Sequence, residues 1–486
     1  MIPAVPLSFP ARLATLARQC PDATAIVEDG VAIDFRGLAV DLAATIRRLS
    51  LLGVTRGQRV GIEVRRDRHA HLLLILACQA LGAITLTLTR EQMSGDTPLA
   101  HGCDLLLTTA PVNPPDPARV RVIDAGWARQ RDAGDLAASL SALPAVHPDP
   151  DAIASISHSS GTTGRPKAMA LTHEIHRRLI EVNVIRMTRD GLILPVSLCL
   201  YGLAVRAVLM RVLAILHLGG TVIFSHEEHA PALLGAGLVN QAMFSVGDME
   251  RIIRRTTHPP VGHEVHVELF GAAVGQGLRQ VISERLTDRV RTRYSSNETG
   301  AVADMDATNV GTLGDGVAVR IVDEAGHDLP LGQVGLVLVR TPTMVTGYLD
   351  DPEATRQAFV DGWFVSRDLG FMPAPDRLVV LGRADDVLNI GGVKVAPGPL
   401  EDALRQIPGI SDAAVLRIAD AGDVGRLVVA IEAPDGHLPD PARAQVEAIL
   451  RAHLRHFRIV PLAGFLRTDT GKVRRAEMIA ALARSA

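Results

Sequence analysis

Apolar residues recur every three or four positions in two stretches near the start of the chain, residues 9–17 and 38–49. This period matches one face of an α-helix, so both stretches are predicted to be amphipathic helices, with a strand between them. Apolar runs follow at residues 60–64 (VGIEV) and 103–109 (CDLLLTT), which is typical of buried strands. The alternation of helices with buried strands predicts an α/β fold with largely parallel sheets.

The residue composition changes at two places in the middle of the chain. A stretch rich in proline and aspartate, residues 143–151, is predicted to be a surface connection, and residues 151–158 (DAIASISH) to be a strand. Residues 311–347 contain short apolar runs punctuated by glycine, which indicates a small β-subdomain.

The C-terminal part has a pattern of its own. Two strands are predicted at residues 413–420 and 427–434, followed by an amphipathic helix at about 441–456. We therefore predict a large N-terminal domain, residues 1–384, that combines parallel α/β sheets with the β-subdomain. A small, mobile α+β domain, residues 385–486, is predicted to follow it.

Length and charge narrow the class of protein. A chain of 486 residues exceeds what one hydrophobic core usually supports, which agrees with the prediction of two domains. The fractions of hydrophobic residues (47%) and charged residues (21%) are typical of a soluble globular protein. The formal net charge of −3 gives no support for binding to nucleic acid or to an anionic membrane.

No segment is predicted to span a membrane. The apolar run at residues 72–84 is too short and is broken by Gln79, and the run at 203–219 is interrupted by Arg206 and Arg211. The N-terminus lacks the basic start and apolar centre of a signal peptide. We predict a cytoplasmic protein whose scattered cysteines, without a CxxC pair, are reduced thiols: Cys20, Cys78, Cys103 and Cys199.

Lysine is rare in this chain. Of its 50 basic residues only three are lysines, Lys167, Lys394 and Lys472, so arginine is the general surface cation. A lysine retained in such a background indicates a position that needs a compact point charge. All three lie in the motifs that follow.

The segment SSGTTGRPK, residues 159–167, has the composition of a phosphate-binding loop. Two glycines and small hydroxylated side chains let backbone amides and hydroxyls converge on a polyphosphate, and Lys167 adds a charge at the end. It is not a Walker A loop, because Pro166 stands where that pattern requires glycine.

This segment resembles the phosphate-binding signature of the adenylate-forming superfamily, which includes acyl- and aryl-CoA synthetases, peptide-synthetase adenylation domains and firefly luciferase. Later segments resemble, in the family's order, its adenine and magnesium segment (YSSNETG, 294–300) and its ribose-binding region (347–370). The segment at 381–401 resembles the interdomain hinge, and RTDTGKVRR (467–475) resembles the loop of the catalytic lysine. The resemblance covers nearly the whole chain.

The resemblance implies a ligase that uses ATP and Mg²⁺ to convert a carboxylic acid into its acyl-AMP. Glu298 matches the carboxylate that holds Mg²⁺, a hard ion suited to oxygen ligands. Asp368, assisted by Arg383, matches the group that binds the ribose hydroxyls, and Tyr294 would stack on adenine. The ATP-binding residues implied are Ser159, Ser160, Gly161, Thr162, Thr163, Gly164, Lys167, Gly271, Ala272, Tyr294, Asn297, Asp368 and Arg383.

Lys472 is the predicted catalytic residue. Attack of a carboxylate on the α-phosphate brings two anions together, which requires a cation where the charge builds up, and Lys472 matches the family's lysine at that point. Asp385 matches the hinge about which the small domain rotates before thioester formation. Gly392 would line the tunnel for the thiol, and Lys394 lies on the same strand.

The sequence departs from the family pattern at some of these motifs. Ser295 and Asn297 replace the usual glycine and threonine around Glu298, Arg367 replaces the glycine before Asp368, and Leu466 replaces a proline. None of these changes removes a charged catalytic group.

The acid substrate is indicated less specifically than the chemistry. The stretch at residues 194–205 contains no acidic residue, which disfavours an ordinary α-amino acid, and Tyr201 to Leu203 resembles benzoate-type CoA ligases. An apolar aryl or short to medium acyl group is predicted. Arg293 would meet a second substrate carboxylate or form a surface ion pair, and we favour the pair. The pocket residues predicted are Leu198, Tyr201, Met243, Ser245, Gly271 and Ala273.

The acyl acceptor is expected to act in trans, because no carrier-domain serine motif follows the small domain. It is either CoA or the phosphopantetheine arm of a separate carrier protein. Two other functions are weighed: a luciferase-like oxygenase, which no residue specifically supports, and a non-catalytic homologue that senses ATP or an acyl group. The presence of Lys167, Glu298, Asp368 and Lys472 disfavours the second.

Overall fold

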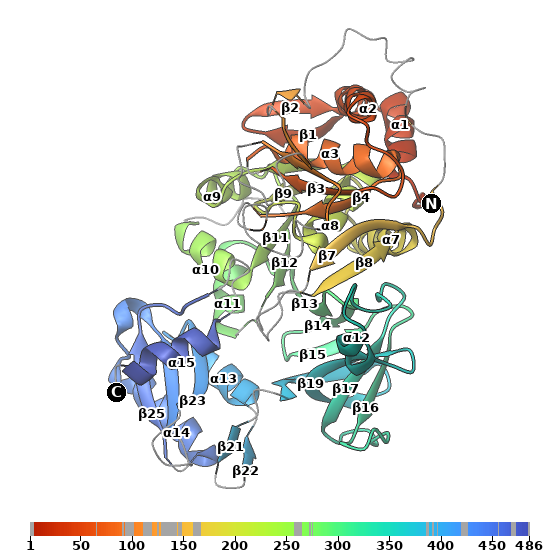
Figure 1. Cartoon of the computed structure of the whole chain (residues 1–486). Helices are drawn as coiled ribbons and strands as arrows, with labels where there is room; N and C mark the ends of the chain where they lie inside the picture. The colour runs from red at the N-terminus through yellow and green to blue at the C-terminus, as the bar shows by residue number, and fades with distance from the viewer. Residues whose placement is uncertain are drawn as a thin grey trace.

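The computed structural model of the chain describes residues 4–64, 66–89, 92, 102–109, 119–123, 126–127, 143, 148–158, 167–256, 265–271, 274, 276–384, 388–390, 393–395, 397–418, 426–454, 456–467 and 473–484. Two large sheets, helices between them, and a smaller C-terminal unit make up this part of the chain (Figure 1).

The larger sheet has 14 strands and changes from parallel to antiparallel along its width. Its parallel part runs in the order β13-β12-β11-β9-β10-β1, and β2 closes that edge antiparallel to β1. These strands are β13 (Val290–Ser296), β12 (His266–Phe270), β11 (Gln241–Ser245), β9 (Val196–Cys199), β10 (Thr221–Phe224), β1 (Thr24–Glu28) and β2 (Val31–Asp34).

The antiparallel part of this sheet is the β-subdomain (Figure 1). A tight hairpin leads from β13 into it, and its remaining strands pair with one another antiparallel. They are β14 (Gly300–Met305), β15 (Val310–Leu313), β16 (Ala318–Val322), β17 (Gly335–Arg340), β18 (Phe359–Val360), β19 (Trp363–Ala374) and β20 (Arg377–Arg383), with helix α12 (Pro352–Ala358) beside them.

The second sheet has six strands in the order β6-β5-β3-β4-β7-β8. They are β6 (Val120–Val122), β5 (Leu105–Thr108), β3 (Arg59–Glu63), β4 (Ile84–Thr87), β7 (Ile153–His158) and β8 (Ala168–Thr172). All neighbouring pairs are parallel except β7 and β8.

One apolar core joins the two sheets. It draws buried side chains from strands of both sheets and from five helices, so these helices form a layer shared by the sheets. The helices are α1 (Phe9–Gln19), α2 (Phe35–Leu51), α3 (Arg68–Ala80), α7 (His173–Arg189) and α8 (Arg206–His217). A second core lies around β11, β12 and the helices α9 (Ala230–Gly235), α10 (Val246–Arg255) and α11 (Gln276–Arg285), with the short helix η3 (Glu227–His229) before α9.

The C-terminal part has a core of its own. A short hairpin pairs β21 (Leu388–Ile390) with β22 (Val393–Val395), and a three-stranded sheet pairs β23 (Asp412–Ile418), β24 (Arg426–Glu432) and β25 (Arg458–Leu462). Its helices are α13 (Pro397–Arg405), η5 (Pro434–Gly436), α14 (Asp440–His453) and α15 (Arg475–Arg484). The domain boundary at residue 385 stays a prediction, and Asp385 itself lies outside the described residues.

The predicted α/β fold is confirmed. The strands expected at 60–64 and 151–158 are β3 and β7, and the C-terminal helix expected at about 441–456 is α14. The opening was predicted as helix, strand, helix, but two strands, β1 and β2, stand between α1 and α2. In the described part of the chain, no helix is long and apolar enough to cross a membrane. All four cysteines are free thiols.

Gly61 of β3 offers a test of how tightly the six-stranded sheet is packed. A Cβ atom at this position would lie 2.6 Å from Leu106 Cδ2 and 2.9 Å from Leu88 Cδ1. We expect Gly61→Ala to destabilise the protein by about 1–3 kcal/mol, because neighbouring side chains must move. Thermal or urea unfolding measures the change.

Gly235 provides the matched control. It ends α9, and a Cβ atom there would meet nothing within 4 Å. Gly235→Ala should leave stability unchanged within about 0.5 kcal/mol or raise it slightly. Equal losses in the two variants would contradict the packing described for β3.

Candidate functional site

The carboxyl ends of the parallel strands β9, β11, β12 and β13 lie along one edge of the large sheet, and the chain segments that follow them carry the candidate residues. Tyr201 follows β9, Ser245 ends β11, and Gly271 follows β12. Glu298 lies in the turn after β13. Ligands of α/β sheets bind at this edge, so the arrangement favours a binding site here.

The turn between β13 and β14 holds Glu298 in a fixed position. The hydroxyls of Thr341 and Thr343 both donate to the carbonyl of Thr299, and the amide of Val345 donates to the carbonyl of Glu298 at 2.9 Å. Gly300 has a φ of 73°, and a Cβ atom there would lie 2.5 Å from the hydroxyl oxygen of Thr343. Glycine is therefore required for this close approach.

Glu298 and Lys167 both contact the side chain of Tyr348. The Tyr348 hydroxyl donates to Glu298 Oε1 at 3.1 Å, and the ammonium of Lys167 lies 4.8 Å from the centre of the Tyr348 ring. A backbone hydrogen bond from Leu349 to the carbonyl of Ala168 (2.7 Å) fixes this pairing of segments. Burial, and then the charge of Glu298, raises the pKa of Tyr348, so its hydroxyl stays protonated as a donor.

Tyr294, Asp368 and Arg383 come together across three strands. Asp368 of β19 and Arg383 of β20 are direct partners in the sheet, and Arg383 Nη1 lies 3.4 Å from Asp368 Oδ1. The Tyr294 hydroxyl donates to the other oxygen of Asp368. Burial is the main cause that raises the pKa of both Asp368 and Tyr294. A buried carboxylate held in this way is suited to accept hydrogen bonds from ligand hydroxyls.

Asn297 has a structural contact that its sequence motif does not reveal. Its side-chain amide donates to the carbonyl of His158 at 3.1 Å, at the end of β7. This bond ties the turn carrying Glu298 to the strand that leads into the glycine-rich segment at residues 159–166.

Tyr201 is held rigidly in the predicted acid pocket. Its hydroxyl accepts the backbone N–H of Ser245 at 2.6 Å and donates to Asp248, and its ring meets the edge of Phe270 with centroids 5.2 Å apart. Burial and the charge of Asp248 raise the pKa of Tyr201. The Tyr201 hydroxyl thus has both a donor and an acceptor partner, and these contacts fix the orientation of its ring.

Two other predicted pocket residues, Met243 and Leu198, lie in different cores. Met243 shares a core with Tyr201 and Phe270, whereas Leu198 packs into the separate core around β11 and β12. Phe270 and Asp248 were missed by the sequence analysis. Asp248 could have been found from the sequence, because a serine followed three residues later by an acidic residue is typical of a helix start. In the structure Ser245 caps α10, and its hydroxyl accepts the backbone amide of Asp248 at 3.1 Å.

Several predicted site residues lie outside the described part of the chain, and their roles stay predictions: Ser159, Ser160, Gly161, Thr162, Thr163, Gly164, Ala272, Ala273, Asp385, Gly392 and Lys472. Lys394 falls on β22.

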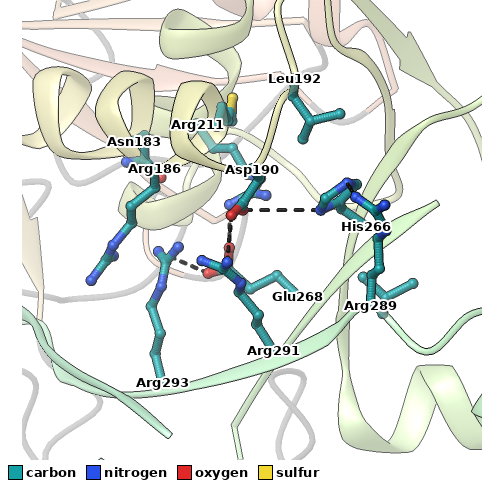
Figure 2. Close-up of a pocket in the computed structure, with 12 residues that line it drawn as sticks. Asn183, Arg186, Asp190, Leu192, Arg211, His266, Glu268, Arg289, Arg291 and Arg293 are labelled. Carbon is teal, nitrogen blue, oxygen red and sulfur yellow. Dashed lines mark hydrogen bonds and ion pairs between the residues drawn. The ribbon is translucent and has the colours of Figure 1, made fainter. Parts of the chain in front are cut away.

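Arg293 belongs to a different place in the fold. It lines a small cavity at the opposite, amino-terminal end of β12 and β13, where arginines from α7, α8, β13 and the segment just before β13 surround Glu268 and Asp190 (Figure 2). Arg293 binds Glu268 at 2.9 Å and Asp304 at 3.1 Å, and its side chain is only 12% exposed. The favoured prediction of an ion pair is therefore confirmed, but the pair is buried.

Glu268 is the central anion of this cavity. Arg211 of α8 and Arg293 of β13 both bind it, and Arg186 of α7 lies nearby (Figure 2). Burial alone would raise the pKa of Glu268, but these arginines lower it to about 2. The attraction between Glu268 of β12 and these arginines thus links β12 to α7, α8 and β13.

The described residues contain no group of three or more histidines, cysteines, aspartates or glutamates that could hold a metal ion. Glu298 is a single buried carboxylate, 9% exposed. A Mg²⁺ ion bound there would need oxygen ligands from a second source, and nucleotide phosphates are such a source. The residues present therefore fit a magnesium ion that arrives with a nucleotide.

Comparisons with known proteins show the family to which the chain is similar. A family model described as AMP-binding enzyme matches residues 13–349. The sulfoacetate–CoA ligase of Cupriavidus necator is 28% identical over 96% of this chain and 97% of its own length. A feruloyl-CoA synthase of Amycolatopsis is 26% identical over 95% and 96%. A 2-succinylbenzoate–CoA ligase of Listeria monocytogenes is 25% identical over 82% and 84%.

Solved structures share the fold at lower identity. ATP-bound MatB from Rhodopseudomonas palustris superposes with a TM-score of 0.77 at 21% identity, covering 98% of this chain and 99% of that one. The O-succinylbenzoate coenzyme A synthetase of Bacillus subtilis, in complex with ATP and a magnesium ion, gives 0.76 at 18% identity and covers 96% and 98%.

The charge cluster around Glu268 generates a prediction on stability. Glu268→Gln should destabilise the protein by about 3–5 kcal/mol, because it leaves buried guanidinium groups without their anion. Since the pKa of Glu268 is lowered in the fold, the full difference from wild type is expected above about pH 4.5, and it should shrink as the pH falls toward 2. Chemical unfolding at several pH values measures this.

Arg189→Gln is the matched control for this variant. Arg189 pairs with Asp315 at 2.8 Å on the surface, with side chains 65% and 74% exposed. Loss of this pair should change stability by less than about 1 kcal/mol. A similarly small effect for Glu268→Gln would show that the buried cluster does not hold these four elements together.

Proposed function

The chain belongs to the AMP-binding enzyme family, and on that basis we propose that it activates a carboxylic acid with ATP and transfers the acyl group to a thiol. In the first step, a carboxylate oxygen attacks the α-phosphorus of ATP, the bond to the bridging oxygen breaks, and pyrophosphate leaves. In the second, the thiol sulfur attacks the acyl carbon and AMP leaves.

The observation that carries this proposal is the convergence of Tyr294, Glu298 and Asp368 at the carboxyl edge of the parallel strands. The pair of Asp368 and Tyr294 gives a buried acceptor for ribose hydroxyls beside an aromatic ring. Glu298 gives a carboxylate for Mg²⁺ close to Lys167. A magnesium ion would neutralise phosphate charge as the two anions approach.

The acid substrate would lie against Tyr201, Met243 and Phe270. This surface is aromatic and apolar, and the Tyr201 hydroxyl is already used by Ser245 and Asp248. It suits an aryl or acyl body whose carboxylate points to the nucleotide. The relatives reported above are named for different acids, so the acid itself is not assigned by similarity.

We propose CoA as the acyl acceptor, because those relatives are named as CoA ligases or synthases. The pantetheine arm of a carrier protein presents the same thiol and is the other acceptor to test. Gly392 would leave room for this arm.

The C-terminal part would act as a lid that brings Lys472 to the site. Its present contact with α10 is polar: Arg254 donates to Ser411 at 3.2 Å, and burial together with Glu432 and Asp412 raises the pKa of Glu250 to about 7. A polar contact of this kind suits a surface that separates during a domain rotation.

Lys472→Ala tests the catalytic assignment. Its acyl-AMP formation, measured as ATP–pyrophosphate exchange or trapped with hydroxylamine, should fall by about 100-fold or more, while ATP binding is largely kept. Arg474→Ala is the control on the same segment, because Arg474 is exposed and pairs with Glu477 at 2.9 Å. Near-normal adenylate formation by Lys472→Ala would refute the assignment.

Asp368→Asn tests the nucleotide site without touching the acid pocket. The side chain of asparagine has the shape of aspartate, but its NH₂ group is a donor and cannot accept a hydrogen bond from a ribose hydroxyl. The KM for ATP should therefore rise by about 10-fold or more. The KM for the acid should change little, and a steady-state titration of each substrate separates the two. An effect confined to the acid would place the nucleotide elsewhere.

A further inference from the structure

Arg206 is the first residue of α8, and only part of its guanidinium group has hydrogen-bond partners among the described residues. Its Nη2 donates to the carbonyl of Ser296 at 3.2 Å. Its Nη1 is buried and has no hydrogen-bond partner within the described part of the chain. Buried polar groups nearly always have a partner, so this nitrogen indicates a ligand.

Two physical effects oppose a cation at this position. Burial disfavours the charge and lowers the pKa of Arg206 to about 10, although the nearby Glu298 acts in the other direction. Arg206 also lies at the amino-terminal end of a 12-residue helix, where the helix dipole adds positive potential. Both effects reverse if an anion binds beside Arg206, because the guanidinium and the helix end then attract it together.

No neighbouring protein group in the described part of the chain bonds to Nη1 of Arg206. His176 of α7 is kept neutral, since burial and the nearby charges of His173 and Arg206 lower its pKa to about 3. Glu298 accepts the hydroxyl of Tyr348 and is the carboxylate proposed for Mg²⁺. A bound substrate is the remaining source of negative charge.

Arg206 lies between the two halves of the site. Five residues before it, Tyr201 lines the acid pocket, and the carbonyl that it binds belongs to Ser296, between Tyr294 and Glu298. Arg293, the other arginine considered for a second substrate carboxylate, is bound to Glu268 and Asp304 at the far end of the strands (Figure 2).

We propose that Arg206 and the amino-terminal end of α8 bind a second anionic group on the acid substrate. The substrate class is then carboxylic acids that also carry a second carboxylate or a sulfonate. This inference rests on the proposed acid activation. Two of the relatives reported above are named for such acids, sulfoacetate and 2-succinylbenzoate, whereas feruloyl-CoA synthase is named for an acid with one carboxylate.

The experiment compares matched acids in ATP–pyrophosphate exchange. Succinate is paired with its monomethyl ester and sulfoacetate with methylsulfonylacetate, so each pair differs in one charge. Wild type should use the doubly charged acid with a kcat/KM about 10- to 100-fold higher. Arg206→Gln should lose this preference through the KM for the acid, with the KM for ATP unchanged, and Arg206→Lys should restore part of it.

Arg189→Gln, which removes the exposed arginine paired with Asp315, should keep the wild-type preference. A second readout does not need turnover: with AMP present, succinate or sulfoacetate should raise the melting temperature of wild type and not of Arg206→Gln. This measurement also shows whether Arg206→Gln is folded.

Four results would overturn the inference. Wild type that uses singly charged acids at least as well would refute it while leaving the proposed acid activation intact. An Arg206→Gln variant with the wild-type preference would remove Arg206 from the subsite. A raised KM for ATP with every acid would assign Arg206 to the phosphates instead. Absence of exchange with every acid would refute the proposed function as well.

Discussion

Parallel pairing of β9, β11, β12 and β13 makes four strands of the large sheet end along the same edge. The candidate polar and aromatic residues lie at the carboxyl ends of these strands or just beyond them. This brings Tyr201, Ser245, Phe270 and Glu298 together although they are far apart in sequence. The β-subdomain continues the same sheet from β13, and it adds Asp368 and Arg383 to that edge. The position of the site follows from the topology of the sheet.

Helix α8 carries two arginines, Arg206 and Arg211, whose surroundings differ. At the amino-terminal end of the strands, Arg211 and Arg293 neutralise Glu268 and hold the layers together. At the other end, Arg206 faces the site with one nitrogen that no described residue satisfies. The first arrangement pairs its arginines with carboxylates of the protein, whereas we propose that a bound ligand completes the second. Both arginines interrupt an apolar stretch of the sequence, but only their partners distinguish a structural role from a binding role.

Much of the fold could be predicted, because the period of the apolar residues indicates which segments are helices or strands with a buried face. The run at residues 60–64 marked β3, and the C-terminal amphipathic pattern marked α14. The hairpin of β1 and β2 was missed, although Asp29 and Gly30, both with positive φ, form the dipeptide that favours a tight turn. Within the site, motif residues such as Glu298 and Asp368 could be named from the resemblance. The bond from Tyr348 to Glu298, and the fixation of Tyr201 by Asp248, depend on contacts between distant segments that no local pattern reports.

The central claim is that a substrate carboxylate attacks the α-phosphorus of ATP at this site. An acid labelled with ¹⁸O in its carboxylate tests it directly, because thioester formation must leave one of the two carboxylate oxygens on AMP. Incubation with ATP, Mg²⁺ and CoA, followed by mass spectrometry of the nucleotide, should show AMP that contains one ¹⁸O atom per turnover. Turnover that yields unlabelled AMP, or ADP and labelled phosphate, would contradict the account.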